Sequence, residues 1–538
     1  MRMHAAWLFV LTAALVIPFL GGVSGAATNF APDGVVHVTP PPPVFDDAKR
    51  QAELAARRKQ VADTIGSNAM LLMFSAEPRV YTNDVDFPFR QENDLFYLTN
   101  LNQKGAKLVL IPSRNPSAIL FLPRRNPAAE TWTGHMYGPE EAAKLSGINE
   151  IWDANEFDGF IKSIQRHDTN QEAYEPKPEN VLWSKRPAPP QGLIDEKLGA
   201  FSALYQAAEA KQAVLYLLVN PQTNPQFESR EYRQEQRFVA GWPKDSGFTI
   251  QNAGPIFAQL RAKKSEWELA LLQHAIDISI EAHERAWIAS ANAKWEYEID
   301  AEVARIFKLR NADNWGYPDI VGCGANATTL HYEEAQAPCK PGDLLLMDVG
   351  AEYGHYSADV TRTTPTNGKF SPAQAAIYQI VYDAQEAAAK AAKPGATLND
   401  AHRASLEVIK AGLLKLGLIT DANSDQYRMW FMHGNGHFLG MNVHDVSAGG
   451  RLEPGMTFTN EPGIYIRPDA LANLPATPEN EKLIAAIKPA FERYKGIGVR
   501  IEDDMLITPE GVKWMTAALP RSIADIETFI AKARRSQP

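Results

Sequence analysis

Two aspartates, Asp348 and Asp359, are spaced so that they could bind one cation together. Residues 343–350 (DLLLMDVG) are typical of a buried strand, and residues 356–363 (YSADVTRT) alternate as a second strand. A turn centred between Tyr353 and Gly354 would place the two carboxylates opposite each other in an antiparallel hairpin. Opposed like charges destabilise a sheet by roughly 0.2 to 1 kcal/mol, and a cation between them removes that repulsion. The alternative is a different register in which one aspartate merely ends a strand.

Three of the chain's 12 histidines, His433, His437 and His444, lie close together in residues 431–446 (FMHGNGHFLGMNVHDV). The glycines between the first two predict a loop, in contrast to the helix that carries the two histidines of a zincin-type protease. A single histidine more often forms a structural hydrogen bond than binds a metal. We therefore expect only one or two of the three to be ligands.

Two glutamates end or interrupt apolar strands in the same part of the chain. Glu461 follows residues 456–460, and Glu502 lies in residues 498–506 (GVRIEDDML) on the same face as Arg500, so an ion pair is its alternative role. Four carboxylates and one imidazole form a hard donor set that suits two Mn, Co or Fe ions better than one structural zinc. Two ions about 3.5 to 4 Å apart would share a water, lower its pKa and polarise a carbonyl. The predicted reaction class is metal-assisted hydrolysis.

The composition excludes several other classes of protein. The chain has 538 residues, of which 45% are hydrophobic and 22% charged, as in globular proteins with a large core. Its 54 basic and 64 acidic residues give a net charge of −10, which argues against a nucleic-acid partner. Only two cysteines are present, so neither a disulfide scaffold nor a four-thiolate zinc site is possible. Cys323 and Cys339 fall in different predicted loops, and separate structural thiols are expected, although an oxidising compartment would allow them to pair.

The N-terminus carries features of export. Residues 5–23 form an apolar run that follows a basic residue and ends in small residues, which predicts a signal peptide over residues 1–26; a permanent membrane anchor is the alternative. Residues 27–45, with four consecutive prolines, predict an extended linker ahead of the fold. No other stretch is apolar enough to span a membrane, so we expect an exported protein, periplasmic or secreted, with no stable span after cleavage.

The rest of the chain alternates between strands and helices, which predicts an α/β (α+β) protein. The clearest elements are helices at residues 46–65, 139–145 and 265–290, and strands at residues 69–74, 107–111, 118–122 and 213–219. The polar, Pro-rich and Gly-rich residues 221–255 indicate a boundary, with the second domain beginning near Leu260. The expected domains are residues 46–258 and 259–538.

Several short motifs resemble one known family. TLHY (residues 329–332), DVG followed by DVTRT, HGNGHFLG followed by VHD, EPGIYI (residues 461–466) and GVRIEDD are similar to those of Xaa-Pro aminopeptidases (aminopeptidase P) and prolidases among the pita-bread metallopeptidases. This resemblance covers roughly residues 260–510. Residues 86–101 (DFPFRQENDLFYLTNL) resemble the creatinase/prolidase N-terminal domain. The implied fold is an N-terminal α/β creatinase-like domain followed by a C-terminal pita-bread peptidase domain.

The resemblance also implies a dinuclear metal site. Asp348 would bind one metal ion, Asp359 and Glu502 would bridge both, and His437 and Glu461 would complete the other. Manganese is the favoured metal, with cobalt, iron or zinc as alternatives. Glu461 would also accept a proton from the shared water and pass it to the leaving proline nitrogen.

Other polar residues gain roles by the same resemblance. His331 and His444 would hold the substrate carbonyl and stabilise the tetrahedral intermediate, which needs donors placed where negative charge develops. His433 would line the proline pocket. Tyr465 and Arg500 would support the pocket and its charge network, and Arg451 would be the counterpart of a substrate-facing arginine. An ordinary structural hydrogen bond is the alternative for each.

Two segments depart from the family pattern. Residues 447–453 (SAGGRLE) are shorter than expected, and the stretch between Ile466 and Gly496 carries an insertion whose residues 480–494 are prone to form a helix. Both lie between predicted ligand strands, so we expect them to reshape the mouth of the site.

The leading hypothesis is an exported aminopeptidase that removes an N-terminal residue preceding proline, acting on peptides with proline in the second position. A prolidase restricted to Xaa-Pro dipeptides is the alternative enzyme. A peptide-binding pseudo-enzyme is the alternative of another class, which the presence of all five candidate ligands disfavours. The resemblance also implies a homo-oligomer, either a dimer or a tetramer.

Overall fold

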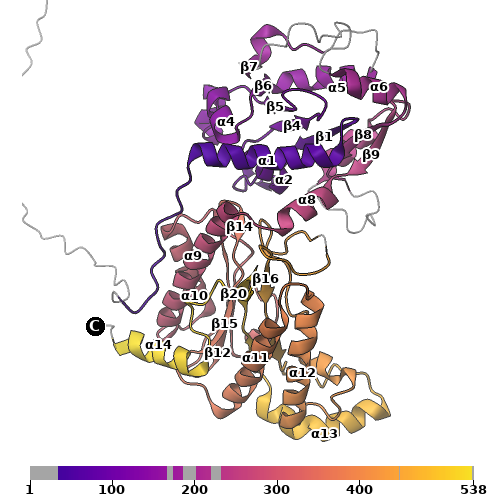
Figure 1. Cartoon of the computed structure of the whole chain (residues 1–538). Coiled ribbons are helices and arrows are strands. Elements are labelled where there is room, and N and C mark those ends of the chain that lie inside the picture. Colours follow the sequence, from indigo (N-terminus) through magenta and orange to yellow (C-terminus); the bar gives the residue numbers. More distant parts are fainter. Residues whose placement is uncertain (1–33, 167–173, 186–200, 220–231, 448, 536–538) are drawn as a thin grey trace, which may run out of the picture.

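The computed structural model describes residues 34–166, 174–185, 201–219, 232–447 and 449–535. Figure 1 shows these residues as an N-terminal unit at the top and a C-terminal unit below it. The predicted signal peptide lies outside the described residues. No helix in the described ranges is both long enough and apolar enough to cross a membrane.

The N-terminal unit is built on a mixed seven-stranded sheet with the order β7-β6-β5-β4-β1-β8-β9. Its strands are β1 (Ala69–Phe74), β4 (Lys107–Leu110), β5 (Ala118–Leu122), β6 (Glu150–Asp153), β7 (Val181–Ser184), β8 (Ala213–Leu217) and β9 (Phe248–Asn252). Every residue of β1 is buried, because β1 is a central strand with both faces covered. Strands β1, β4, β5 and β8 lie where the apolar runs predicted strands, so these four predictions are confirmed.

Eight helices belong to this unit in the described residues, and their ends agree with the local sequence. They are α1 (Asp47–Ile65), α2 (Asn93–Thr99), α3 (Pro127–Thr133), α4 (Pro139–Ser146), α5 (Phe157–Arg166), α6 (Ser202–Glu209), α7 (Arg233–Ala240) and α8 (Gly254–Ala262). The carboxylate of Asp46 accepts a hydrogen bond from the backbone N–H of Lys49 and caps α1. Within the segment predicted as a boundary, α7 and β9 still belong to the N-terminal unit.

Of the segment predicted as a linker ahead of the fold, residues 34–45 are described, and they are instead packed on the C-terminal unit. Figure 1 shows it, in indigo, running from α1 down the side of that unit. The backbone N–H and the hydroxyl of Thr39 both donate to Glu281, at 2.9 and 2.7 Å, and Val36 is buried. The prediction was wrong because proline content reports only backbone stiffness, whereas Glu281 supplies a buried acceptor that the local sequence does not reveal.

The C-terminal unit is organised around the long helix α9 (Glu266–Ser290). A capping box between Ser265 and Glu268 begins this helix. Its other helices are α10 (Glu296–Leu309), α11 (Pro372–Ala391), α12 (Leu398–Leu416), α13 (Pro478–Tyr494) and α14 (Ile523–Arg535). The predicted helix-prone insertion is α13, and Figure 1 shows it at the end of the molecule farthest from the N-terminal unit.

Short antiparallel sheets form the middle of this unit. One has the order β11-β12-β15, another β10-β13-β14, a third β16-β19-β20, and β17 pairs with β18. Their bounds are β10 (Asn314–Trp315), β11 (Ile320–Cys323), β12 (Leu344–Asp348), β13 (Ala351–Tyr353), β14 (Tyr356–Ser357), β15 (Thr361–Pro365), β16 (Thr457–Asn460), β17 (Gly463–Tyr465), β18 (Gly498–Arg500), β19 (Asp503–Thr508) and β20 (Gly511–Trp514).

The predicted aspartate hairpin is present, but its register differs from the prediction. Asp348 pairs with Thr361, not with Asp359, because the turn is centred one residue later, between Gly354 and His355. Both residues have positive φ, 59° and 69°, as a two-residue type I′ turn requires. Asp359 thus lies two residues from the direct partner of Asp348, and both still project from the same face.

The two cysteines are joined. A disulfide links Cys323, at the end of β11, to Cys339, and their Cα atoms are 5.4 Å apart. The expectation of separate thiols was wrong because the chain folds back between them through the 3₁₀ helix η6 (Gly324–Thr328). Residues 323–339, which we call the 323–339 loop, therefore form a covalently closed segment.

Removing this disulfide is expected to destabilise the C-terminal unit. In the chain-entropy account, a crosslink that closes a loop of this size stabilises the folded state by about 3 kcal/mol. We therefore expect the variant C323A/C339A to unfold at a lower temperature than the oxidised wild type, as followed by circular dichroism. A reductant should lower the midpoint of the wild type and leave that of the variant unchanged. Equal midpoints for the variant and the oxidised wild type would contradict the prediction.

Candidate metal centre

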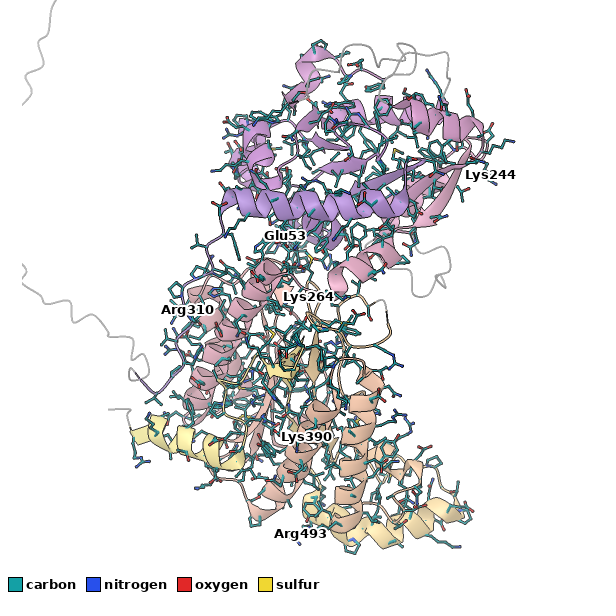
Figure 2. All side chains as sticks on the ribbon, viewed as in Figure 1. Glu53, Lys244, Lys264, Arg310, Lys390 and Arg493 are labelled. Carbon is teal, nitrogen blue, oxygen red and sulfur yellow. A yellow bond between two sulfur atoms is a disulfide. The ribbon has the colours of Figure 1, made fainter. Side chains whose placement is uncertain are left out.

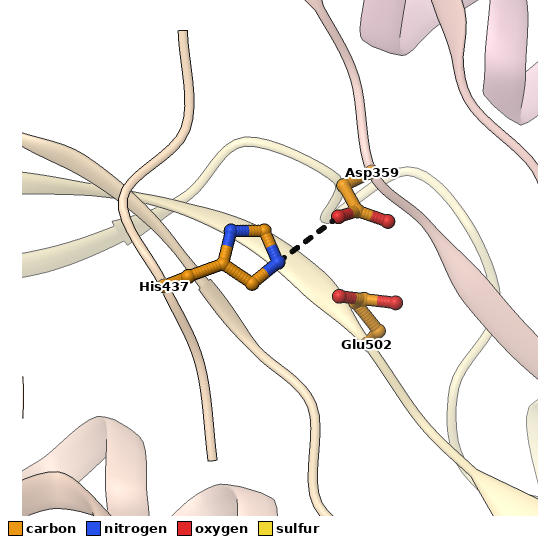
Figure 3. Close-up of side chains that lie close together, drawn as sticks. All are labelled: Asp359, His437 and Glu502. Carbon is orange, nitrogen blue, oxygen red and sulfur yellow. Dashed lines mark ion pairs between the residues drawn. The ribbon is translucent and has the colours of Figure 1, made fainter. Parts of the chain in front are cut away.

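Three of the predicted ligands meet in a small cluster. Figure 3 shows the imidazole of His437 pointing at Asp359, with the carboxylate of Glu502 beside them. Potential ligand atoms of the three residues all lie within 4.8 Å of one another. Nε2 of His437 is 3.2 Å from Oδ2 of Asp359. The other ring nitrogen, Nδ1, bonds the carbonyl of Phe438 at 3.1 Å, which leaves Nε2 available as a ligand.

The strand ends explain how these distant residues meet. Asp359 precedes β15, and Glu502 lies at the corner between β18 and β19. The backbone N–H of Glu502 donates to the carbonyl of Thr361 at 3.0 Å, so that corner is held against β15. His437 reaches the same place because its backbone pairs with Thr459 of β16. The cluster therefore depends on three separate sheets.

The remaining two predicted ligands flank the cluster. Oε1 of Glu461, the residue after β16, lies 3.5 Å from Nε2 of His437. Asp348, at the end of β12, accepts hydrogen bonds from Arg500 and from the hydroxyl of Tyr317, each at 2.5 Å. The ion-pair alternative for Glu502 is thus not observed, since the guanidinium of Arg500 pairs with Asp348. All five predicted ligands lie on the wall of one pocket.

This pocket has a volume of about 490 Å³ and is open to solvent. Its wall combines the predicted ligands with three histidines and a few apolar side chains. The other lining residues are Tyr317, Pro318, Ile320, Leu330, His331, Glu333, His433, Gly434, Gly436, Val443, His444 and Arg500. This volume lies in the range of pockets that bind small molecules, and it is large enough for a short peptide segment.

The electrostatics of the pocket favour a bound cation. Burial raises the pKa of Glu502 well above its usual value, and the charges of Asp359 and Glu461 add to that shift. Burial likewise raises the pKa of Glu461 to about 7. Burial acts to lower the pKa of His437, but the hydrogen bond to Asp359 and the negative charges of Asp359 and Glu461 together outweigh it and raise this pKa to about 9. Crowded, buried carboxylates of this kind are the hard oxygen donors that divalent ions prefer, so the residues present fit a metal.

A hydrogen-bonded chain supports the ligands from behind. The hydroxyl of Thr361 donates to Glu502 at 2.6 Å and accepts from Nε of Arg500 at 3.0 Å. Another guanidinium nitrogen of Arg500 donates to the hydroxyl of Tyr465, which in turn lies 2.9 Å from Nε2 of His433. Burial and the charge of Arg500 lower the pKa of His433 to about 4, so its imidazole is neutral.

Three residues of this network were not singled out from the sequence. Thr361 and Arg362 lie within the DVTRT motif, and Tyr317 lies in a loop without any distinguishing pattern. The buried guanidinium of Arg362 donates to the carbonyl of Glu502 and to the carboxylate of Asp503, each at 2.6 Å. A charged residue inside the alternating strand was the available signal for Arg362.

The structure places the two proposed carbonyl-binding histidines at the pocket. Two other predicted residues are not among those that line it: the buried Tyr465, which reaches the pocket only through His433 and Arg500, and Arg451. The rings of His437 and His444 are 4.2 Å apart, and the exposed His331 lines the same pocket. Arg451 is exposed, is absent from the lining residues, and donates to the carbonyl of Gly395. The helix α13 also contributes no lining residue, so the insertion does not form part of the pocket wall.

The N-terminal unit braces the loop that carries His444. The buried guanidinium of Arg261 bonds both Asp94 of α2, at 2.7 Å, and Asp445, at 2.5 Å. Lys264, which Figure 2 labels at the junction of the two units, donates to the second oxygen of Asp445 at 3.0 Å. Asp94, which lies in the 86–101 motif noted above, is therefore linked through Arg261 to the residue that follows His444.

Comparisons with known proteins agree with this architecture. The family model described as Metallopeptidase family M24 matches residues 270–509, and the one described as Aminopeptidase P, N-terminal domain, matches residues 54–174. The Xaa-Pro aminopeptidase of Haemophilus influenzae is 34% identical over 489 residues, which cover 89% of this chain and 97% of that protein. The Xaa-Pro aminopeptidase of Escherichia coli is 30% identical over 90% of this chain and 98% of its own length.

Solved structures show the same likeness. Aminopeptidase P from Escherichia coli with the inhibitor Pro-Leu superposes with a TM-score of 0.70 at 29% identity, covering 90% of this chain and 99% of that chain. An aminopeptidase from Pseudomonas aeruginosa gives a TM-score of 0.70 at 30% identity, with coverage of 91% and 99%. The likeness therefore extends over both units of the fold.

Proposed function

Because this chain belongs to the Xaa-Pro aminopeptidases of metallopeptidase family M24, we propose that it is an exported enzyme that hydrolyses the bond between an N-terminal residue and a following proline. The observation that carries the proposal is the convergence of four carboxylates and His437 on the wall of one open pocket. Asp348, Asp359, His437, Glu461 and Glu502 would hold two divalent cations, and manganese is the favoured metal. Bound there, they would supply Lewis acidity and lower the pKa of a shared water.

The protein's own groups divide the remaining work. Glu461 accepts a proton from the attacking water and delivers it to the proline nitrogen, which has no hydrogen of its own. His331 and His444 stand on the pocket wall as donors for the oxygen of the scissile carbonyl. His433, held by Tyr465, presents a neutral ring to the proline side of the bond.

The charges of the pocket favour an aminopeptidase over a prolidase. A prolidase needs a cation for the free carboxylate of its dipeptide substrate. Among the lining residues that the structure describes, Arg500 is the only arginine or lysine, and Asp348 and Tyr465 already engage it. A peptide that continues beyond proline has no carboxylate at that position, so its binding does not bury a negative charge without a cation to pair with it.

Two further parts of the proposal concern location and assembly. The disulfide between Cys323 and Cys339 supports export, because such bonds persist in oxidising compartments. N-terminal sequencing of the protein from the periplasm or medium would test cleavage near Ala26.

We also propose a dimer or tetramer, which the exposed side chains of Tyr81, Phe87 and Trp132 on the N-terminal unit support. Light scattering measures that state.

A peptide assay tests the activity directly. The chain without residues 1–26 is stripped with chelator and then assayed with an Xaa-Pro-Yaa tripeptide and an Xaa-Pro dipeptide, before and after manganese is added. We expect manganese to restore cleavage of the tripeptide at the Xaa-Pro bond, with little cleavage of the dipeptide. Cleavage of the dipeptide alone would indicate a prolidase. Cleavage of neither peptide by protein shown to contain metal would exclude both enzymes.

A further inference from the structure

The 323–339 loop brings part of the pocket wall to the site, although its residues include little regular structure. Leu330, His331 and Glu333 lie in this loop and line the pocket. The only helical element inside it is η6, whose five residues end before His331. A histidine that must meet a carbonyl oxygen at hydrogen-bond distance therefore needs support from outside the loop.

One buried carboxylate supplies much of that support. Glu296, in the first turn of α10, has no exposed surface. Its Oε1 accepts hydrogen bonds from the backbone N–H of Cys323 at 2.7 Å and from Nδ2 of Asn326 at 2.9 Å. Its Oε2 accepts from the hydroxyl of Tyr332 and from the backbone N–H of Ala337, both at 2.8 Å. This single side chain thus bonds the loop before and after His331.

The backbone beside Glu296 is bonded to the same loop. The N–H of Glu296 donates to the carbonyl of Ala337 at 3.0 Å, and the N–H of Cys339 donates to the carbonyl of Lys294 at 2.9 Å. The disulfide closes the base of the loop. The side chain of Tyr332, next to His331, also packs with Tyr465 in a small apolar cluster. The position of His331 is therefore determined from both sides.

We propose that Glu296 is a positioning residue for catalysis, which holds the 323–339 loop so that His331 faces the substrate carbonyl. Glu296 does not line the pocket and acts only through the loop. This inference rests on the proposed function, because it assumes that His331 contributes to peptide hydrolysis. It is distinct from that function, since none of the predicted metal ligands lies in the 323–339 loop, and a displaced loop leaves them intact.

The chemistry of the four donors explains why a carboxylate is needed. All four groups approach as donors, and an ionised carboxylate is a side chain that only accepts. Glutamine keeps the shape but turns one oxygen into an NH₂ group. The hydroxyl of Tyr332 can reverse and accept from that group, whereas the N–H of Ala337 cannot. The variant E296Q should therefore fold and lose the bond to one end of the loop.

The test compares E296Q with E298Q in the metal-loaded enzyme. Glu298 lies on the same helix, is exposed, and bonds only the local backbone N–H of Lys294 among the contacts observed. We expect E296Q to lower kcat for an Xaa-Pro-Yaa tripeptide roughly 10- to 100-fold, with KM little changed, because misplacement of a catalytic group by about 1 Å has effects of this size. E298Q should behave as the wild type. Amides of the 323–339 loop should exchange hydrogen faster in E296Q, while those of β12 and β15 should not.

A double variant separates positioning from general damage. If Glu296 acts through His331, E296Q should cost little further activity in an H331A background, so the two losses should not multiply. Multiplying losses would overturn the inference, as would full activity of E296Q in an enzyme whose wild type cleaves the tripeptide. A wild type that cleaves no Xaa-Pro peptide would instead refute the proposed function. Should E296Q fail to fold, Y332F, which removes one of the four bonds, is expected to show a smaller loss in the same direction.

Discussion

Replacing Glu502 by glutamine is expected to lower kcat/KM for an Xaa-Pro-Yaa tripeptide by about 10³-fold or more, since a bound metal contributes several kcal/mol to the transition state. Glu502 shares a cluster with Asp359 and His437, and ligand atoms of the three lie within 4.8 Å of one another. Glutamine is neutral and offers a single oxygen, so this position would hold a divalent cation much less strongly. The shape of the side chain and its hydrogen bond from Thr361 can remain.

The metal content must fall together with the activity for this explanation to hold. Elemental analysis of the purified variant should find less than the wild-type content of metal after dialysis. The matched control is E510Q, which changes an exposed glutamate in the turn that follows β19. E510Q should retain both activity and metal. A fully loaded E502Q enzyme with normal kcat/KM would show that Glu502 is not a ligand.

Thermal unfolding gives an independent reading of the same site. A ligand that binds only the folded state stabilises it, so manganese should raise the melting temperature of the wild type. Manganese should have a much smaller effect on E502Q. Without metal, E502Q should be at least as stable as the wild type, because the substitution removes one of several crowded, buried negative charges near Asp359 and Glu461. A metal-free E502Q far less stable than the metal-free wild type would mean that Glu502 acts mainly in folding.

Replacing Arg362 by leucine is expected to destabilise the protein by about 3 to 5 kcal/mol, the usual cost of removing one partner of a buried ion pair. Arg362 has no exposed surface and pairs with Asp503 at 2.6 Å. It also donates to the backbone carbonyls of Thr361, Glu502, Leu519 and Pro520. The substitution leaves a buried carboxylate without its cation and several carbonyls without donors.

The measurement is urea unfolding followed by tryptophan fluorescence, with R403L as the matched control. Arg403 is exposed on α12 and pairs with Asp400 within one helical turn, so its loss should cost less than about 1 kcal/mol. R362K should lie between the two, because lysine keeps the charge but lacks the planar fork that serves several acceptors. A midpoint for R362L equal to that of R403L would contradict the assigned role of the buried network.

The sequence by itself determined the elements whose signals are local. Residues 46–65 and 69–74 were predicted as a helix and a strand because a capping aspartate, a closing glycine and an apolar run are neighbours along the chain. The candidate donor set was also visible in the sequence, since carboxylates that end or interrupt apolar strands and clustered histidines are unusual enough to suggest a metal site. The resemblance to aminopeptidase P then assigned an order to these ligands.

Only the tertiary structure decided how those residues meet. Arg500 pairs with Asp348 across 152 residues, and Thr361 bonds Glu502 across 141, so no local pattern contains either contact. The hairpin register depended on His355, which adopts positive φ while its ring stacks on Phe96 of the other unit.

The same reason accounts for the predictions that failed. The segment predicted as a linker is held by Glu281, and the two cysteines are joined by a reversal of the chain between them. Arg451 was assigned to the substrate only through the family resemblance, in a segment that departs from the family pattern, and its side chain bonds Gly395, outside the pocket. Periodicity and motif spacing indicate which residues are suited to a buried position and which can carry a charge. Which of them become partners depends on the packing of segments far apart in sequence, and that information appears only once the chain is folded.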